Sequence, residues 1–506
     1  MDARTTRLLE QASTNGWPMP AGDPPGDSAI VAWLGQPGPR DPSGVGRYLA
    51  AVWRERADLR EAFPGVPFDR TQRDAYLEWA RSFAVIETGA DPRLIPEAPS
   101  NPASFRAGSS QAERPDGITV VGYLRAQLGL GAAARRMVSL LRNAEISVQA
   151  IPYDHTDSPL TVEWPDVALE NIIVNQITVL CVNAPELPRL TRALGPRHLA
   201  ETYRIGLWFW ELEVLPEPAV DMVEACGLVD EIWVTSDFVA RAFRQRVSEL
   251  RLNVPVEVLP LGLDVPAPSG AIGRSRLRIP EGFVIGASFD YASTVERKNP
   301  VGMIDAFQRA FPDPFELGPD VGPWLVIKTH GSPEFDRDRA MIKEAVAARP
   351  DIVIVDANFT EAEQHAFYRS INVYISLHRS EGYGLGPLEA MANGVPTVAT
   401  AYSGNLSFMT AQNSWLVPAG RTTVPPGCGH YPAGSTWADP DVTSAAFMLR
   451  EITTGYDTDR VRQRAAFGKA ETAGLVSGDS GARWVRDRLH SIRSRPDWRD
   501  RKPALG

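Results

Sequence analysis

The sequence has few cysteines and no surplus of basic residues. Its 506 residues include three cysteines, Cys181, Cys226 and Cys428, which lie far apart and show no C-x-x-C spacing. This argues against a disulfide framework or a zinc site, and it favours a reducing cytoplasm. The 62 acidic residues outnumber the 52 lysines and arginines, which gives a formal net charge of −10. A general nucleic-acid-binding protein is not expected, because such proteins carry a basic field.

Long apolar runs are also missing. No stretch reaches about 18 apolar residues, the length that crosses a bilayer. The first 30 residues contain Asp2, Glu10 and scattered prolines, and they lack the apolar core of a signal peptide. We therefore expect a cytoplasmic protein without a membrane span. Hydrophobic residues make up 43% of the chain, enough for two to four globular domains at this length.

Residues 1–115 differ from the rest of the chain. Prolines are frequent there, and helical apolar spacing occurs only over 44–60 and 73–84. These patterns predict a small helical N-terminal module, followed by a linker rich in Pro, Ser and Gly over 96–117. Its role is either packing and spacing or docking of an acceptor or partner.

From residue 116 onward, strand and helix patterns alternate, as is typical of doubly wound α/β domains. We predict one Rossmann-like domain over 116–270 and a second over 271–475, separated by a loop with Pro266, Pro268 and Gly270. Residues 476–506 contain one more helix, over 481–492. Strands are predicted at 118–123, 177–182, 205–210, 232–235, 256–261, 283–289, 325–329, 352–355, 373–377 and 397–399. Ligands bind at the carboxyl ends of such strands, so two facing domains predict one interdomain cleft.

The most informative segment follows the apolar strand at 373–377. Glu381 and Glu389 stand eight positions apart around a turn that contains three glycines, and Pro387 suits the first position of a helix. A strand, a glycine turn and a helix N-terminus together make an anion site, because free N–H groups and the helix dipole point at the ligand. A carboxylate beside a phosphate is unfavourable unless it binds something neutral. Sugar hydroxyls are the obvious candidates.

This Glu-x7-Glu segment resembles the donor-sugar site of retaining family 4 glycosyltransferases with the GT-B fold, such as bacterial polysaccharide and O-antigen mannosyltransferases. The resemblance extends through 402–409 and 289–300 and covers roughly 117–475. It implies the GT-B fold: two facing Rossmann-like domains, here with the helical N-terminal module added and the last helix crossing back to the N-terminal α/β domain. It also implies that Glu381 contacts sugar hydroxyls and that Glu389 accepts hydrogen bonds from ribose. The remaining donor-binding residues implied are Gly382, Tyr383, Gly384, Leu385, Gly386 and Leu388. His378, just before the turn, is expected either to have a structural role or to contact the donor directly.

Arg297 and Lys298 are the best candidates for a diphosphate clamp. They lie in the loop after the strand at 283–289, and both side chains suit phosphate oxygens. In the family an arginine precedes the lysine by several positions; here Ala292 and Ser293 occupy that stretch, so only the Arg297–Lys298 pair remains. Lys328, at the end of the strand over 325–329, is expected either to touch phosphate or base or to be a surface lysine.

The run from Trp208 to Glu211 is predicted to extend the strand at 205–210 and to end at the cleft. Many family members have a histidine near this position, and none is present here. Trp210 or Glu211 is therefore expected to line the reaction centre, with a buried aromatic core and a turn-capping glutamate as the alternative.

Gly129 and Gly131 open a predicted helix and allow close approach of the donor diphosphate or acceptor. A dinucleotide fingerprint is disfavoured, because Ala134 stands where the third glycine belongs. No Asp-x-Asp follows a strand in a way that implies a divalent metal, and clustered His ligands are absent. We therefore expect no cofactor and a metal-independent reaction.

These observations predict a retaining hexosyltransferase that uses a nucleotide-diphosphate sugar and a hydroxyl acceptor on a glycan, a lipid-linked sugar or a small molecule. A GDP- or UDP-linked donor is expected, with a mannose-type sugar mildly favoured. The alternatives are a nucleotide-sugar epimerase or phosphorylase, or a non-catalytic binding protein, on the same fold. The helix with Arg135, Arg136 and Arg142 is expected either to pack on its sheet with a solvated face or to touch an anionic membrane surface. The sequence indicates no oligomeric state.

Overall fold

The computed structural model describes residues 3–14, 18–20, 22, 25–37, 45–64, 66, 70–88, 90–95, 115–126, 128–156, 160, 162–164, 173–194, 199, 202–216, 225–263, 272–318, 320–331 and 335–495. The chain divides into two units, Met1–Glu113 and Arg114–Gly506. Most of the predicted linker at 96–117, and the predicted boundary loop with Pro266, Pro268 and Gly270, lie outside the described residues.

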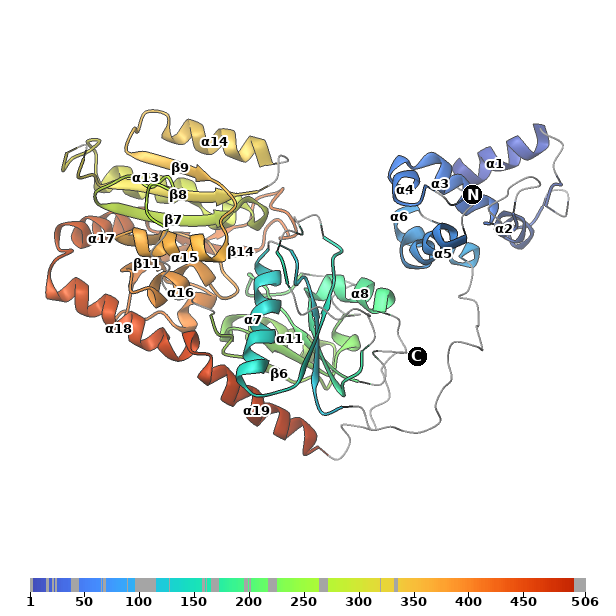
Figure 1. The fold of residues 1–506 in the computed structure, drawn as a ribbon. Helices are drawn as coiled ribbons and strands as arrows, with labels where there is room; N and C mark the ends of the chain where they lie inside the picture. The colour runs from blue at the N-terminus through green and yellow to red at the C-terminus, as the bar shows by residue number, and fades with distance from the viewer. Residues whose placement is uncertain are drawn as a thin grey trace. The chain divides into compact units, whose positions relative to one another are not determined.

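The first unit is helical, as predicted (Figure 1). Its helices are α1 (Ala3–Thr14), α2 (Asp27–Gly35), α3 (Arg47–Glu55), α4 (Ala57–Ala62), α5 (Arg70–Trp79) and α6 (Val85–Thr88). The single helix predicted over 44–60 is wrong, because Arg56 is extended and separates α3 from α4. The helix predicted over 73–84 begins earlier, and a π-helical turn replaces its end at Ala80–Ala84. Trp33, Tyr48 and Tyr76 are buried in the core of this unit.

The first sheet of the second unit is entirely parallel and has the order β2-β1-β3-β4-β5-β6. Its strands are β1 (Ile118–Gly122), β2 (Val148–Pro152), β3 (Ile177–Cys181), β4 (Tyr203–Leu207), β5 (Glu231–Val234) and β6 (Val256–Val258). The predicted strand at 205–210 is wrong at its end, since β4 stops at Leu207 and leaves Trp208 to Glu211 in the following loop. β2 was not predicted, because this edge strand is only partly buried and lacks a long apolar run.

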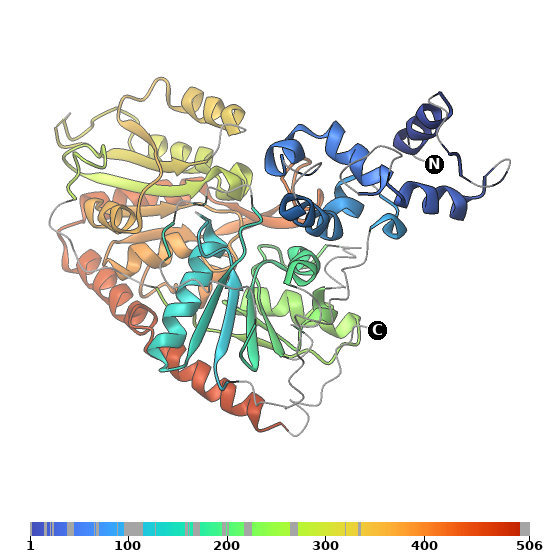
Figure 2. The same ribbon diagram turned by 45° about the vertical axis from the view of Figure 1, so that its right-hand side comes forward.

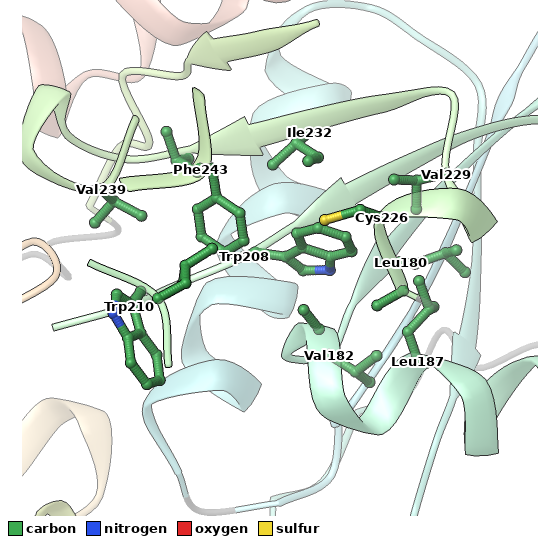
Figure 3. Packing of buried hydrophobic residues seen from close by; sticks show 14 of the residues in the cluster. Leu180, Val182, Leu187, Trp208, Trp210, Cys226, Val229, Ile232, Val239 and Phe243 are labelled. Carbon is green, nitrogen blue, oxygen red and sulfur yellow. The ribbon is translucent and has the colours of Figure 1, made fainter. Parts of the chain in front are cut away.

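Helices cover both faces of the sheet (Figure 2). Alternating side chains of its strands pack against these helices. Val120 and Val179 face α7 (Gly129–Asn143), whereas Val121 and Leu180 face α8 (Leu187–Leu194) and α11 (Asp237–Glu249). Figure 3 shows the apolar cluster that contains Leu180, in which the buried Trp208 ring lies 5.4 Å from the ring of Phe243. Trp208, the first residue of the aromatic run after β4, therefore belongs to the hydrophobic core.

The second sheet is also parallel and has the order β12-β11-β10-β7-β8-β9. Its strands are β7 (Val284–Asp290), β8 (Trp324–His330), β9 (Ile352–Asp356), β10 (Val373–Ser376), β11 (Thr397–Thr400) and β12 (Trp415–Val417). The helices are α12 (Val295–Lys298), α13 (Pro300–Ala310), α14 (Asp336–Val346), α15 (Glu361–Ser370), α16 (Leu385–Ala392) and α17 (Val442–Thr454). The two parallel α/β domains confirm the predicted fold class.

Three further elements complete the second unit. An antiparallel hairpin of β13 (Ala419–Thr423) and β14 (Thr436–Pro440), which was not predicted, follows the second sheet. The helices α18 (Asp459–Val476) and α19 (Asp479–Arg493) run along the edge of both α/β domains (Figure 1). Val485 and Leu489 of α19 are buried in the same apolar cluster as α7, so the chain returns to its first α/β domain. Across the part of the chain that the structure describes, every helix falls short of the length or apolar character needed to cross a bilayer.

Candidate functional site

The loops at the carboxyl ends of the two sheets meet. Ser236, which follows β5, donates a hydrogen bond of 2.6 Å to the carbonyl of Gly382, which follows β10. The Tyr383 hydroxyl donates to the carbonyl of Leu261 over 3.2 Å. The Ser380 hydroxyl likewise donates to the carbonyl of Glu211, after β4. The ligand-binding edges of both domains therefore share one region.

Two glycines of the turn, Gly382 and Gly384, are required by the backbone. Gly384, the N-cap of α16, has a φ of +90°, which side chains rarely adopt. A Cβ at Gly382 would lie 3.0 Å from the carbonyl oxygen of Trp210, so a side chain there would push the two domains apart. The Leu388 N–H already bonds to the Gly384 carbonyl, and Pro387 has no N–H. The helix geometry leaves the N–H groups of Leu385 and Gly386 for an anion.

The carboxylate and the two cations predicted at the site contact one another. Lys298 Nζ lies 2.5 Å from Glu381 Oε1, and Arg297 Nη1 lies 3.2 Å from Glu381 Oε2. Arg297 also donates to the carbonyl of Ser380 over 2.8 Å. The side chains of these charged groups are between 5% and 18% exposed. We call Arg297, Lys298 and Glu381 the ionic cluster.

The charges of the ionic cluster are set by burial and by mutual attraction. Burial raises the pKa of Glu381, but the Lys298 and Arg297 charges oppose it and lower the pKa to about 2. Burial lowers the pKa of Lys298 even though Glu381 favours its charged form. The cluster therefore presents an ionised carboxylate held between two cations at neutral pH.

The second carboxylate of the Glu-x7-Glu segment is paired across the domains. Glu389 of α16 accepts a hydrogen bond of 2.7 Å from Arg136 of α7. The neighbouring Arg135 donates to the carbonyls of Leu124 and Ala126. Both arginines form hydrogen bonds within the protein. The prediction that they belong to a solvated or membrane-facing basic surface on α7 is therefore wrong.

Lys328 lies buried at the carboxyl end of β8. Its Nζ is 3.2 Å from Nδ1 of His330 and 5.2 Å from the centre of the Phe359 ring. Burial lowers the pKa of Lys328 to about 8, although Asp290 and Glu389 favour its charged form. The surface-lysine alternative is therefore excluded, and Lys328 is a buried cation at a ligand-binding edge.

His378 is engaged within the protein through both ring nitrogens. Nδ1 lies 3.0 Å from the Ser376 hydroxyl, and Nε2 lies 3.1 Å from Asn405 Oδ1 and 3.3 Å from the Tyr402 carbonyl. The ring ties β10 to the turn after β11. A direct ligand role for His378 is not supported by this arrangement, since neither nitrogen points to a free space.

Glycines 129 and 131 take different places at the start of α7. Gly129 is exposed, and a Cβ there would meet nothing within 4 Å. A Cβ at Gly131 would lie 2.5 Å from the carbonyl of Ala126, so Gly131 is required by backbone packing. Backbone packing therefore explains the glycine at position 131 without a bound ligand.

The hairpin loop between β13 and β14 brings residues to the site that the sequence reading missed. Tyr431 donates a hydrogen bond of 3.0 Å to Glu211 Oε2, and the Arg297 guanidinium lies 5.8 Å from the centre of the Tyr431 ring. His430 lies beside it, with its ring 6.0 Å from that of the buried Trp210. The available signal was a Cys-Gly-His-Tyr sequence inside a stretch of prolines and glycines.

The hairpin loop thus connects Glu211 to the ionic cluster. Burial raises the pKa of Tyr431 well above its ordinary value, so the hydroxyl keeps its proton and donates it to the Glu211 hydrogen bond. Burial also lowers the pKa of His430. Where the structure describes the chain, no group of three or more His, Cys, Asp or Glu residues is arranged to hold a metal ion.

Comparison with known proteins finds one family model. Residues 291–422 match the model described as "Glycosyl transferases group 1", a segment that contains the ionic cluster, Lys328 and Glu389. No curated protein matches the chain.

Solved structures resemble the fold. The sucrose-phosphate synthase of Thermosynechococcus elongatus is 15% identical, with a TM-score of 0.53 over 75% of this chain and all of that one. HepE of Anabaena, solved in complex with UDP and glucose, is 12% identical, with a TM-score of 0.51 over 74% of this chain and 100% of that one. The pneumococcal O-GlcNAc transferase GtfA has a TM-score of 0.44 at 15% identity over 63% of this chain, which spans 57% of its length. At 15% and 12% identity, the likeness to the first two structures shows the GT-B fold and nothing finer.

Proposed function

We propose that this protein is a glycosyltransferase that moves a hexose from a nucleotide-diphosphate sugar to a hydroxyl acceptor. One observation carries the proposal: Glu381 is held between Lys298 and Arg297 beside a glycine turn and a helix N-terminus. Two cations and free N–H groups suit a diphosphate, and a carboxylate among them suits sugar hydroxyls. The match of residues 291–422 to the group 1 glycosyltransferases supports the same chemistry.

When the donor binds, the charged groups of the ionic cluster would exchange one another for the donor as hydrogen-bond partners. In the protein alone, Lys298 and Arg297 neutralise Glu381. A diphosphate that enters this loop attracts both cations, and Glu381 then accepts hydrogen bonds from hydroxyls of the transferred sugar. Because the three groups are buried, their interactions with the growing charge of the leaving diphosphate are strong.

The proposed reaction is retaining. The bond between the anomeric carbon and the diphosphate oxygen breaks, and the acceptor oxygen bonds to the same face of that carbon. The acceptor proton passes to the leaving phosphate oxygen, so the products are a nucleoside diphosphate and the extended acceptor. Lys298, Arg297 and the N–H groups at the start of α16 stabilise the leaving group. Glu211, held by Tyr431, lies on the side of the first α/β domain and orients the acceptor hydroxyl.

We further propose that the reaction needs no metal ion, since Arg297, Lys298 and Lys328 supply three positive charges for the diphosphate. The base is proposed to be uracil or guanine. The transferred sugar is proposed to be of the mannose type, because the Ser403–Asn405 and Glu296–Asn299 segments resemble those of O-antigen and capsule enzymes.

The first experiment is a thermal-shift panel with UDP, GDP, ADP and dTDP, each with and without EDTA. A ligand that binds only the folded state raises Tm by mass action. We expect one diphosphate to raise Tm equally in both conditions and Lys298→Ala to lose the shift. The exposed Arg309, which pairs with Asp305 on α13, provides the matched control Arg309→Ala.

Product analysis then separates the reaction classes. A transferase releases nucleoside diphosphate in proportion to extended acceptor. An epimerase converts the donor without an acceptor. If no diphosphate shifts Tm, the proposal fails and a non-catalytic protein on this fold remains.

A further inference from the structure

A pocket of about 380 Å³ lies beside the ionic cluster, on the side away from Lys328. Its walls come from both α/β domains: the loop after β4, the start of α11, the turn after β11 and strand β13. The lining residues are Glu213, Asp237, Phe238, Arg241, Ala401, Tyr402, Ser403, Leu406, Ser407 and Arg421. None of the roles considered so far uses it.

The charged groups of the pocket balance one another. Arg421 Nη2 lies 2.6 Å from Glu213 Oε1 and closes one wall. Asp237 and Arg241 are exposed at the start of α11 and add one charge of each sign. A lining of two carboxylates and two guanidiniums with no net charge suits a neutral ligand with many hydroxyls, because such a ligand needs both donors and acceptors.

Two aromatic rings add an apolar surface. The Tyr402 ring packs edge to face against the Phe238 ring at 5.5 Å, and the Arg421 guanidinium lies 5.0 Å from the centre of the Tyr402 ring. Aromatic faces pack well against the apolar faces of sugar rings. The pocket therefore combines the two kinds of surface that recognise a pyranose.

Ser403 connects the pocket to the ionic cluster. It lines the pocket, and its hydroxyl accepts a hydrogen bond of 2.8 Å from the Glu381 N–H. Its backbone has a φ of +79° and a ψ of −148°, an unfavourable conformation for a residue with a side chain. A second connection is the short segment between Glu211, at the reaction centre, and Glu213, in the pocket.

The order of the strands sets the direction in which a substrate would extend. Along the second sheet the order is β9-β8-β7-β10-β11, and neighbouring strands lie about 4.8 Å apart. Lys328 ends β8, the clamp follows β7, Glu381 follows β10 and the pocket follows β11. In the proposed function Lys328 and the clamp hold the diphosphate and Glu381 holds the transferred sugar, so the place after β11 is left for the acceptor.

We infer that this pocket binds a sugar residue of the acceptor, one ring beyond the residue that carries the reacting hydroxyl. The inference rests on the proposed function, and it names the acceptor class as a glycan of at least two residues. Arg241 and Tyr402 supply its hydrogen bonds and its packing surface.

The test is direct binding, which needs no transfer. The labelled full-length chain, with UDP or GDP present, is applied to a printed array of monosaccharides and of their di- and trisaccharides. We expect disaccharides to bind up to about tenfold more tightly than the matching monosaccharides, since a well-packed ring contributes roughly that factor. Arg241→Ala and Tyr402→Ala should lose the difference, and Arg309→Ala should keep it.

The outcomes separate the two proposals. Binding of no glycan, or an unchanged preference in both pocket variants, overturns the assignment of the pocket. If a diphosphate still raises Tm in that case, the glycosyltransferase proposal stands without it. If sugars bind with the expected pattern and no diphosphate raises Tm, the pocket stands as a glycan-binding site, and its acceptor role fails together with the transferase proposal.

Discussion

Arg136 donates a hydrogen bond of 2.7 Å to Glu389, and this pair joins the two α/β domains through the carboxylate predicted to hold the donor's ribose. The two side chains are only 8% and 12% exposed. The resemblance implies that ribose hydroxyls contact Glu389, so a bound nucleotide shares this carboxylate with Arg136. Under the proposed function, domain contact and donor binding would therefore be coupled at this residue.

The first prediction concerns the stability of that pair. Arg136→Met leaves the Glu389 carboxylate buried without its cation, and we expect the free energy of unfolding to fall by about 3 kcal/mol. The double variant Arg136→Met with Glu389→Leu should recover most of the loss, because no uncompensated charge remains. Urea denaturation followed by circular dichroism measures both. Equal stability of the single and double variants would contradict the expected buried charge.

The second prediction follows from the low pKa of Glu381. This pKa is about 2 in the folded protein and about 4.5 in an unfolded chain, so the folded state favours the ionised carboxylate. The resulting stabilisation is fully present above about pH 4.5, and it is lost as the pH falls toward 2. For a shift of this size it is of the order of 3 kcal/mol.

Glu381→Gln tests it, because glutamine keeps the shape and removes the titration. Between pH 2 and pH 4.5, Tm of the native protein should rise more steeply with pH than Tm of the variant. The exposed Glu281, with its side chain 84% exposed, gives the control Glu281→Gln, which should keep the native slope. Parallel curves for native protein and Glu381→Gln would show that the carboxylate is not held by its cations.

The third prediction is that nucleotide binding takes up a proton at Lys328. Burial lowers the Lys328 pKa to about 8, whereas an unfolded lysine titrates near 10.5. His330, Asp290, Glu389 and Asp356 face the same amine, and the carboxylates favour its charge. A diphosphate adds negative charge and raises this pKa, so affinity should fall as the pH rises through about 8.

Calorimetric titration at pH 8.5 in two buffers of different ionisation enthalpy counts the protons. We expect uptake of up to one proton by the native protein and of almost none by Lys328→Arg, since arginine stays charged. Identical uptake by both would place the titrating group elsewhere. The stability of the protein without nucleotide has the opposite pH dependence. The unfolded state binds more protons than the folded state between pH 8 and 10.5, so the Lys328 contribution to stability rises with pH there.

Local signals in the sequence predicted the parts that depend on neighbouring residues. The apolar run at 373–377 contains β10. Periodicity failed at Arg56, because the apolar spacing continues past a residue that the structure places in an extended conformation. It failed again after Leu207, where the buried Trp208 belongs to the core without belonging to the strand.

The pairings of the site are tertiary and had no local signal. Lys298 and Glu381 are 83 residues apart, and Arg136 and Glu389 are 253 residues apart. Lys298, Glu381 and Glu389 were identified as site candidates, whereas Arg136 was expected on a solvated or membrane-facing helix surface. The mutual neutralisation of these residues depends on how two sheets and two domains meet. The hairpin loop had no periodicity at all, because prolines and glycines dominate it.

The last prediction tests that hairpin loop. Tyr431→Phe keeps the ring beside Trp210 and Arg297 and removes only the hydroxyl that bonds to Glu211. A hydrogen bond to a charged group contributes about 1.5–3 kcal/mol, so loss of its orienting effect should lower kcat by at least about tenfold. The KM for the donor should stay the same, because the hydroxyl does not touch the diphosphate loop. Tyr456→Phe, a tyrosine that packs on Phe283, is the matched control and should retain the native kcat. If Tyr431→Phe also keeps it, Glu211 needs no support from the loop, and the loop lies outside the reaction centre.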